Sequence, residues 1–331
     1  MEDQILRALH ENMGYRRGER VAIIVQEWAE HLGRAEDFAE SKALAREMES
    51  AFASAGIPVR ICSYIPSIPR NGVDATEELY AQFDAPEEVV FMPTVFSLTH
   101  TRFRKMLSER GSRIASMPGF TLALFAPNGP MDADLEALEE ATAAVAQNLK
   151  SARSVHIRAD GTEMDVEIEP MLVHSSTGNI TKAGAVGNLP GAEAYAVPVH
   201  RGNSNGHFTV PAGWGGPFPL EHAMRFRIRN GAFHTVEAVD DTPDARRYAR
   251  EVVAPLIFSG EDHEVFAELG IGTNPQITAG SIREYGWRIL TAEKIWGSAH
   301  FANGNNAGMG GRNDVPVHID WVVPNVSISY R

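Results

Sequence analysis

Residues 20–64, RVAIIVQEWAEHLGRAEDFAESKALAREMESAFASAGIPVRICSY, alternate the patterns of a strand, a helix and a second strand. The run at 21–25 is apolar throughout, as in a strand that is covered on both faces. Residues 37–55 have apolar positions at helical spacing and end at Gly56, just before Pro58. The run VRICSYI at 59–65 then repeats the strand pattern. This order predicts a parallel sheet with helices on its faces.

The same alternation of helix and strand patterns continues on both sides of residues 20–64. Helical spacing is also found at 4–13, 77–83 and 100–111, and EEVVFMPT at 87–94 reads as a further buried strand. We therefore expect an α/β protein whose residues 1–130 form a parallel-sheet, Rossmann-like domain. The sequence has no G-x-G-x-x-G after a strand and no Walker motif, so nucleotide binding is not expected.

Residues 132–151 are predicted to form a helix with acidic residues near its start and Lys150 near its end. The composition of the chain changes after this helix. Residues 154–170 read as a hairpin with Asp160-Gly161 in its turn, and strand patterns return at 224–231 and 232–239. Helices are predicted at 243–258 and around 282–285. Because glycine, asparagine and proline are dense between 178 and 219, we expect residues 131–331 to form a loop-rich α+β metal-binding domain.

Composition excludes some partners. The net charge of −13 and the pI near 5.4 argue against nucleic acid and anionic membranes as partners. The N-terminus lacks the pattern of a signal peptide, and no window has the apolar length of a membrane span. The single cysteine, Cys62, lies in an apolar run and is expected to be a buried, inert thiol. These features predict a cytoplasmic protein in a reducing compartment.

The first candidate ligands are His318 and Asp320 in VPVHIDWVV at 315–323. If this run is a strand, the two side chains lie on one face, about 7 Å apart along the chain. An imidazole and a carboxylate that lean together can bind one metal ion. The alternative is a salt-bridged pair on an exposed sheet face.

Three further candidates lie upstream of this pair. Glu193 in GAEAYAVP and Glu268 in ELGIGTNP are acids within apolar, glycine-punctuated runs, where a buried charge needs a partner or a metal. His300 lies among small residues in GSAHFANGNN, although a lone histidine there could also be structural. Glu293 is a weaker candidate because it stands beside Lys294 and could instead cap the helix that follows it.

Taken together, the candidates allow two kinds of metal centre. Glu193, Glu268 and Asp320 supply three negative charges, and a bridging hydroxide would supply a fourth, which balances two divalent ions. Paired ions about 3.5–4 Å apart serve aminopeptidases and similar hydrolases. Alternatively, His300, His318 and Asp320 have the composition of a mononuclear non-heme iron triad. That second centre leaves two buried glutamates unexplained.

His100 and Arg104 are the candidates in the first domain. They lie in SLTHTRFRK at 97–105, after the strand predicted at 87–94 and at the start of a helix. The end of a strand and the N-terminus of a helix favour an anion, so both residues could bind substrate. The alternative is that Ser97 or Thr99 caps the helix and His100 is solvated.

Several of these motifs together resemble the leucyl aminopeptidase T family of thermophilic metalloproteases. The similar segments are NLPGAEAYAVP at 188–198, ELGIGTNP at 268–275, TAEKIWGSAHFANGN at 291–305 and VHIDW at 317–321. The resemblance covers most of the chain and implies an α/β first domain, a metal-bearing second domain and a homodimer. It implies a two-metal aminopeptidase with the ligands Glu193, Glu268, His300, His318 and Asp320.

Two departures resemble a divergent branch of that family, the 2,5-dihydroxypyridine dioxygenases. The aminopeptidases have a tyrosine seven positions after the motif histidine, where this chain has Ala307, and the segment between His300 and His318 is short. The branch implies one iron bound by His318 and Asp320, with His100 over the substrate. It is also expected to carry a histidine where this chain has Glu268.

We therefore expect a metal-dependent hydrolase that cleaves an amide bond of a small or peptide substrate. It would use two divalent ions (zinc, cobalt or manganese), with Glu193 or Glu268 accepting a proton from water and with His100 and Arg104 holding the substrate. The alternative is an iron(II) ring-cleaving dioxygenase that uses His300, His318 and Asp320, with His100 as base. A third possibility is a family member that binds metal or a metabolite without turnover.

Overall fold

The computed structural model describes residues 1–85, 87–281 and 287–331. The chain divides into two compact units, each of which is described by itself. The first consists of Met1–Ala137 and Ser176–Gly191, and the second of Leu138–Ser175 and Ala192–Arg331. A single boundary near residue 130 therefore leaves out the return of 176–191 to the first unit.

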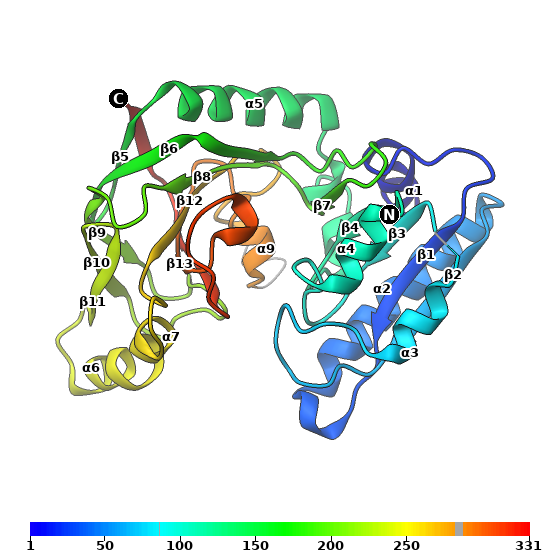
Figure 1. Cartoon of the computed structure of the whole chain (residues 1–331), viewed down its shortest axis with the longest axis horizontal. Coiled ribbons are helices and arrows are strands. Elements are labelled where there is room, and N and C mark those ends of the chain that lie inside the picture. Colours follow the sequence, from blue (N-terminus) through cyan, green and yellow to red (C-terminus); the bar gives the residue numbers. More distant parts are fainter. Residues whose placement is uncertain (86, 282–286) are drawn as a thin grey trace. The chain divides into compact units, whose positions relative to one another are not determined.

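The first unit contains a five-stranded parallel sheet in the order β2-β1-β3-β4-β7 (Figure 1). Its strands are β1 (Val21–Gln26), β2 (Val59–Tyr64), β3 (Val89–Met92), β4 (Arg113–Ser116) and β7 (Val186–Asn188). Its helices are α1 (Glu2–Arg7), α2 (Ala35–Ser54), α3 (Glu77–Tyr80) and α4 (Arg102–Glu109). Shorter helical turns lie at Ala8–Asn12, Glu30–Leu32, Ala81–Phe83, Leu122–Phe125 and Pro130–Asp132.

Apolar periodicity explains these elements. Every residue of β1 is buried, as expected for a strand in a sheet that is covered on both faces. The buried positions of α2 include Phe38, Leu44, Met48 and Phe52, which recur at helical spacing. Cys62 is fully buried in the core of this unit, as the sequence predicted.

The second unit contains a ten-stranded sheet whose main order is β11-β10-β9-β6-β8-β12-β13-β14. Strands β5 and β15 pair with each other, and β5 also pairs with β6. The strands are β5 (Ser154–Ala159), β6 (Thr162–Ser176), β8 (Glu193–Pro198), β9 (Asn205–Val210), β10 (Met224–Arg229), β11 (Ala232–Ala238), β12 (Phe266–Gly272), β13 (Ala299–Gly304), β14 (His318–Val323) and β15 (Ser327–Tyr330).

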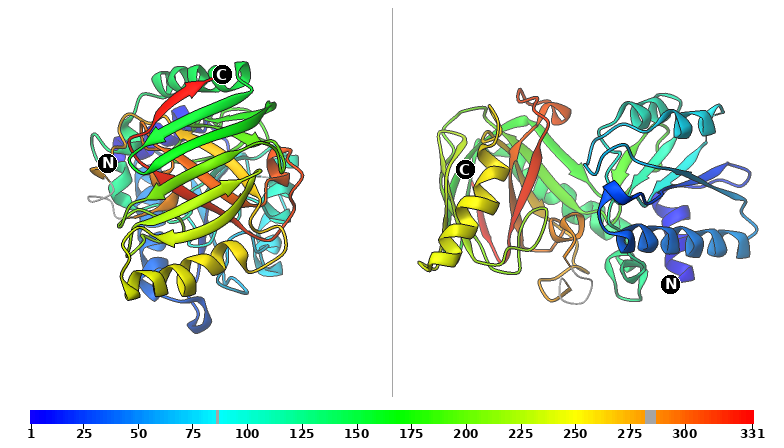
Figure 2. Two further views of the ribbon diagram at one scale, coloured as in Figure 1. Left: turned by 90° about the vertical axis from the view of Figure 1, so that its left-hand side faces the viewer. Right: turned by 90° about the horizontal axis from the view of Figure 1, so that it is seen from below.

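Helices border this sheet. They are α5 (Leu135–Ser151), α6 (Pro243–Tyr248), α7 (Ala254–Phe258) and α9 (Ile289–Ala292), with a π-helical segment at Ala249–Val253 joining α6 to α7. Figure 2 shows the strands side by side, with α6 and α7 in yellow beside β11. The helix predicted around 282–285 lies outside the described residues. The structure confirms the α/β fold class, with a parallel sheet in one unit and a larger, mainly antiparallel sheet in the other.

Alternation along four neighbouring strands separates an apolar face from a polar face. Ala194 and Ala196 of β8, Leu269 and Ile271 of β12, Ala299 and Phe301 of β13, and Trp321 and Val323 of β14 all lie in one core cluster. Because successive strand residues point to opposite faces, Glu193, Glu268, His300, His318 and Asp320 share the other face. A β-bulge between Phe266 and Glu268 permits Phe266 to join the core although Glu268 does not.

No helix in the described part of the chain is both long enough and apolar enough to cross a bilayer.

Candidate metal centre

The five predicted ligands lie together on the polar face of β8, β12, β13 and β14, with His300 at their centre. The Nε2 atom of His300 is 3.1 Å from Oε1 of Glu268, 3.7 Å from Oε2 of Glu193 and 4.0 Å from Oδ1 of Asp320. The Nε2 atom of His318 is 3.4 Å from Oε2 of Glu268 and 3.3 Å from Oδ1 of Asp320. Glu268 therefore presents one carboxylate oxygen to each imidazole.

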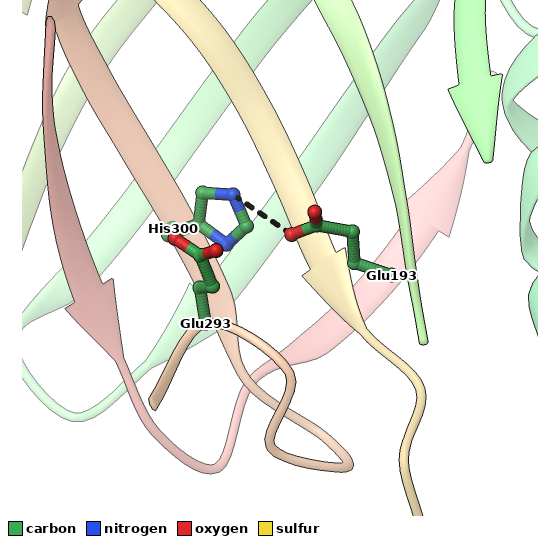
Figure 3. A group of neighbouring side chains, drawn as sticks. All are labelled: Glu193, Glu293 and His300. Carbon is green, nitrogen blue, oxygen red and sulfur yellow. Dashed lines mark ion pairs between the residues drawn. The ribbon is translucent and has the colours of Figure 1, made fainter. Parts of the chain in front are cut away.

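Together with Glu293, these five side chains form two groups of three, each with potential ligand atoms within 4.8 Å of one another. The inner group is Glu193, Glu293 and His300, which Figure 3 shows facing one another. The outer group is Glu268, His318 and Asp320. Glu193 and His300 are buried, whereas the His318 side chain is 32% exposed, so the outer group faces solvent.

Lys294 is part of this cluster, although the sequence interpretation assigned it no role. Its side chain is fully buried, and its Nζ lies 2.6 Å from Oε1 of Glu193 and also bonds to Oε1 of Glu293. Burial alone would lower the pKa of Lys294, but the charges of Glu193 and Glu293 raise it above its usual value. Glu293 itself is the C-cap residue of α9, so it ends that helix and does not cap a following one.

The cluster perturbs the protonation of its members. Desolvation raises the pKa of the Glu268 carboxyl, but hydrogen bonds from His300 and His318 bring it well below its usual range. Burial lowers the pKa of His300, but its hydrogen bond to Glu268 and the nearby carboxylates raise it to about 9. Burial outweighs the charge of Lys294 at Glu293 and raises the pKa of that carboxyl to about 7.

The outer pair follows the same pattern. Desolvation lowers the pKa of His318, but the charge and hydrogen bond of Asp320 raise it well above its usual value. Desolvation raises the pKa of Asp320, yet the charge and hydrogen bond of His318 leave it lowered. Protons on the imidazoles thus balance the carboxylates, in the place where a bound cation would do so.

An unpaired buried oxygen of the inner group supports a metal ligand role. Among the described residues, Oε2 of Glu193 and Nδ1 of His300 are buried without any hydrogen-bond partner. An unpaired buried carboxylate oxygen is costly unless a cation or a donor satisfies it. Because Oε2 of Glu193 faces Nε2 of His300, the donor set fits a divalent cation that takes both nitrogen and oxygen ligands.

Small residues make room for this cluster. In the strand register, Gly270 lies opposite both Tyr195 and His300, and Ala302 lies between Glu268 and Asp320. A Cβ atom at Gly270 would lie only 2.0 Å from Nε2 of His300. The imidazole of His300 therefore occupies the space that any larger residue at position 270 would need.

The loop between β13 and β14 orients His318. Nδ1 of His318 lies 2.6 Å from the carbonyl oxygen of Asn305, which can only accept, so Nδ1 carries the hydrogen and Nε2 faces the outer group. Asn306 and Asn313 hold the loop together: Oδ1 of Asn306 accepts the Asn313 N–H at 2.9 Å, and Nδ2 of Asn313 donates to the carbonyl of Gly304 at 2.7 Å. Ala307, at the position of the family tyrosine, is exposed in this loop.

His100 and Arg104 belong to the first unit. Thr101, and neither Ser97 nor Thr99, caps α4, since its hydroxyl accepts the Arg104 N–H. His100 is exposed directly before this cap, and Nε of Arg104 donates to the carbonyl of Thr99 at 2.5 Å. Burial lowers the pKa of the Arg104 guanidinium. Their role in substrate binding stays a prediction.

Tyr195 is a further residue of the polar face that sequence reasoning missed. It lies two positions after Glu193 on β8, and its ring stacks on that of His174 at 5.1 Å. Burial, together with the carboxylates of Glu268, Glu193 and Glu293, raises the pKa of the Tyr195 phenol well above its usual value. The i, i+2 spacing from Glu193 was the available signal, but its use required β8 to be recognised as a strand.

Two solved structures share this fold. The 2,5-dihydroxypyridine dioxygenase from Pseudomonas putida KT2440 has a TM-score of 0.72 and 16% identity, covering 99% of this chain and 93% of that one. The AmpT protein from Thermus thermophilus has a TM-score of 0.59 and 15% identity, covering 99% of this chain and 94% of that one. No curated protein sequence matches the chain.

The family model NicX, described as 2,5-dihydroxypyridine 5,6-dioxygenase, matches residues 6–330, which is almost the whole chain. The two structural likenesses agree with the resemblance to the aminopeptidase T family and its dioxygenase branch. The chain therefore belongs to the 2,5-dihydroxypyridine 5,6-dioxygenase family of enzymes.

Proposed function

We propose that the protein is a metal-dependent hydrolase that holds two divalent ions and cleaves an amide bond of a small or peptide substrate. The observation that carries this proposal is the position of Glu268, whose two oxygens face His300 and His318 separately. A carboxylate in that position can bridge two ions. The remaining ligands would be Glu193 and His300 for the inner ion, and His318 and Asp320 for the outer ion.

Zinc, cobalt or manganese ions bound at these residues would polarise the substrate carbonyl and activate a water molecule. Both oxygens of Glu268 face imidazoles, Oε1 of Glu193 is bonded to Lys294, and Oε2 of Glu193 is the oxygen assigned to the inner ion, so neither predicted proton acceptor would keep a free oxygen. Glu293 is the one carboxylate of the two groups that the five-ligand assignment leaves unused, and we assign proton acceptance to it.

The exposed side of the outer group is where substrate would approach. His318 and Asp320 have side chains that are 32% and 16% exposed, whereas those of His300 and Glu193 are 1% and 7% exposed. We retain His100 and Arg104 as the residues that hold the polar or anionic end of the substrate. We also retain the homodimer that the family resemblance implies.

A one-ion dioxygenase is the second candidate, because the family match favours it. Glu268, His318 and Asp320 alone form a group of three ligands, and Lys294 already neutralises part of the inner group. A single iron(II) at the outer group would supply oxygen chemistry to a hydroxylated pyridine, with His100 as base. The predicted triad of His300, His318 and Asp320 has the two histidines and one carboxylate of a facial triad. Against this candidate, Nε2 of His300 lies nearer to Glu268, at 3.1 Å, than to Asp320, at 4.0 Å, and the outer group alone has one histidine and two carboxylates.

Metal content distinguishes the two candidates. Protein purified without added metal is expected to contain two zinc, cobalt or manganese ions per chain and to hydrolyse amide substrates without consuming oxygen. One iron per chain, together with oxygen uptake on 2,5-dihydroxypyridine, would overturn the hydrolase proposal. Glu268→Gln is expected to weaken the binding of both ions, whereas Asp320→Asn should weaken the binding of the outer ion only.

A further inference from the structure

Lys294 is held in place by its backbone as well as by its side chain. Its carbonyl accepts the N–H of Asn274 at 3.0 Å, just beyond the end of β12. A Cβ atom at Gly272 would lie 2.6 Å from the carbonyl carbon of Lys294 and 2.1 Å from the oxygen of Ile295. Since Gly272 pairs directly with Glu193 across the sheet, the missing side chain at Gly272 allows Lys294 to pass close to Glu193.

The ammonium group of Lys294 has no contact with solvent. Its side chain is 0% exposed, and its two carboxylate partners, Glu193 and Glu293, have side chains that are 7% and 10% exposed. Removing one partner of a buried ion pair strongly destabilises the folded protein, because the other charge stays buried without a partner. Lys294 is therefore fixed with respect to both carboxylates.

This contact also fixes the direction of the second oxygen of Glu193. A carboxylate is planar, so a bond from Nζ to Oε1 determines where Oε2 points. That oxygen is buried, has no hydrogen-bond partner among the described residues, and lies 3.7 Å from Nε2 of His300. Without Lys294, the carboxylate could rotate and bond elsewhere.

We propose that Lys294 is a positioning residue for the metal centre: it binds Oε1 of Glu193 so that Oε2 is presented, with His300, to the inner divalent ion. This inference rests on the proposed two-ion function. On this proposal Lys294 orients Glu193 in addition to neutralising the charge of Glu293. The competing explanation is that Lys294 is only a counter-ion, and the two explanations differ in what happens when both charges are removed together.

The test compares zinc binding to metal-free protein by isothermal titration calorimetry, with metal content measured by mass spectrometry. The variants are Lys294→Met and the charge-balanced pair Glu293→Gln with Lys294→Met. The control is Lys42→Met, which removes a partly exposed lysine paired with Glu27. Thermal melting shows whether each variant is folded, and the charge-balanced pair is expected to fold because it leaves fewer unpaired buried charges.

We expect wild type and Lys42→Met to bind two ions. Both Lys294 variants should bind the outer ion normally and the inner ion about 10–100-fold more weakly, as when an outer partner of a metal ligand is lost. Two ions with wild-type affinity in the charge-balanced variant would overturn this inference alone. A single ion in wild type would overturn the two-ion function, and this inference with it.

Discussion

Gly270 illustrates how one residue controls the centre. Its absent side chain leaves the space that the His300 ring occupies, since a Cβ atom would lie 2.0 Å from Nε2 and Cε1 of that ring. Gly270→Ala must therefore rotate His300 or separate β12 from β13. We expect metal affinity to fall by about tenfold or more, and the free energy of unfolding to fall by about 1–3 kcal/mol. Titration calorimetry and urea unfolding measure both effects.

A second glycine provides the matched control. Among the residues that the structure describes, a Cβ atom at Gly280 would meet only the Thr278 hydroxyl at 3.5 Å, an ordinary contact. Gly280→Ala should therefore leave metal binding unchanged. If Gly270→Ala bound metal as tightly as wild type, His300 would not be a ligand, and the inner ion would need another nitrogen donor.

At this scale, the sequence predicted the five side chains that the structure brings together. Glu193 and Glu268 are acids within apolar runs, His318 and Asp320 alternate with apolar residues, and His300 lies among small residues. It could not predict that Lys294 joins them. An adjacent Glu-Lys pair is usually solvated, and only the pairing of Gly272 with Glu193 shows that Lys294 passes beside a buried acid. The binding of metal by these residues stays a prediction.

Among the elements, the loop between β13 and β14 holds His318, and a substitution of Asn306 tests this role. This residue is 1% exposed, accepts the N–H of Asn313, and donates to the carbonyl of Ala267 at 3.3 Å. Asn306→Ala leaves those groups unpaired, which costs about 1–3 kcal/mol. Because Asn305 in the same loop orients His318, we also expect the outer ion to bind more weakly, as titration calorimetry would show.

Arg312, exposed in the same loop, is the control position. Arg312→Ala should keep the wild-type melting temperature and the wild-type affinity for both ions. Equal behaviour of the Asn306 and Arg312 variants would mean that the loop does not hold His318.

The start of α4 depends on Asp74, which stabilises it in a pH-dependent way. The Asp74 carboxylate accepts hydrogen bonds from the Phe103 N–H at 3.0 Å, from Nε of Arg102 at 2.8 Å and from the Tyr80 hydroxyl at 3.1 Å. Burial raises the pKa of Asp74, but the bonds from Phe103, Arg102 and Tyr80 lower it below its usual value.

A lowered folded-state pKa stabilises the protein fully above the unfolded value of about 3.9 and progressively less as the pH falls through the folded value. We expect Asp74→Asn to cost about 1 kcal/mol at neutral pH, and progressively less as the pH falls through the lowered folded-state pKa, below which wild type is protonated as well. Thermal unfolding followed by circular dichroism measures this. Asp84→Asn, at an exposed position, is the control, and a pH-independent cost of Asp74→Asn would contradict the argument.

Strand alternation explains most of what could be predicted for the elements. The hairpin of β5 and β6 and the strand β14 were evident because their apolar residues alternate or cluster. Strand β7 was not, since Val186–Asn188 is a three-residue segment in a glycine-rich region and pairs with β4 far away in sequence. Short strands of this kind are determined by their neighbours rather than by their own pattern.

For the whole molecule, the same long-range pairing explains why the division into units could not be read from composition. The segment Ser176–Gly191 resembles a loop of the second half, yet β7 within it extends the parallel sheet of the first unit. The metal centre lies within the second unit alone, because its strands β8, β12, β13 and β14 all belong there.

A chelator should destabilise the second unit specifically. Bound ions would connect four strands of that unit, and a ligand at about 100 times its dissociation constant adds about 2.7 kcal/mol of stability. A different side chain reports on the unfolding of each unit. Four of the five tryptophans, including the fully buried Trp321, lie in the second unit. Cys62 lies in the first, and burial raises the pKa of its thiol to about 11, so it reacts only after unfolding.

In a urea titration, EDTA is therefore expected to move the tryptophan transition to lower urea while leaving the exposure of the Cys62 thiol to a thiol reagent unchanged. Glu268→Gln, which should bind metal weakly from the outset, is the control and ought to be insensitive to EDTA. If both signals moved together in wild type, the units would unfold as one, and the ions would stabilise the whole chain. If neither moved, the buried carboxylates would be satisfied by the protonated imidazoles and Lys294 alone, and the metal assignment would fail.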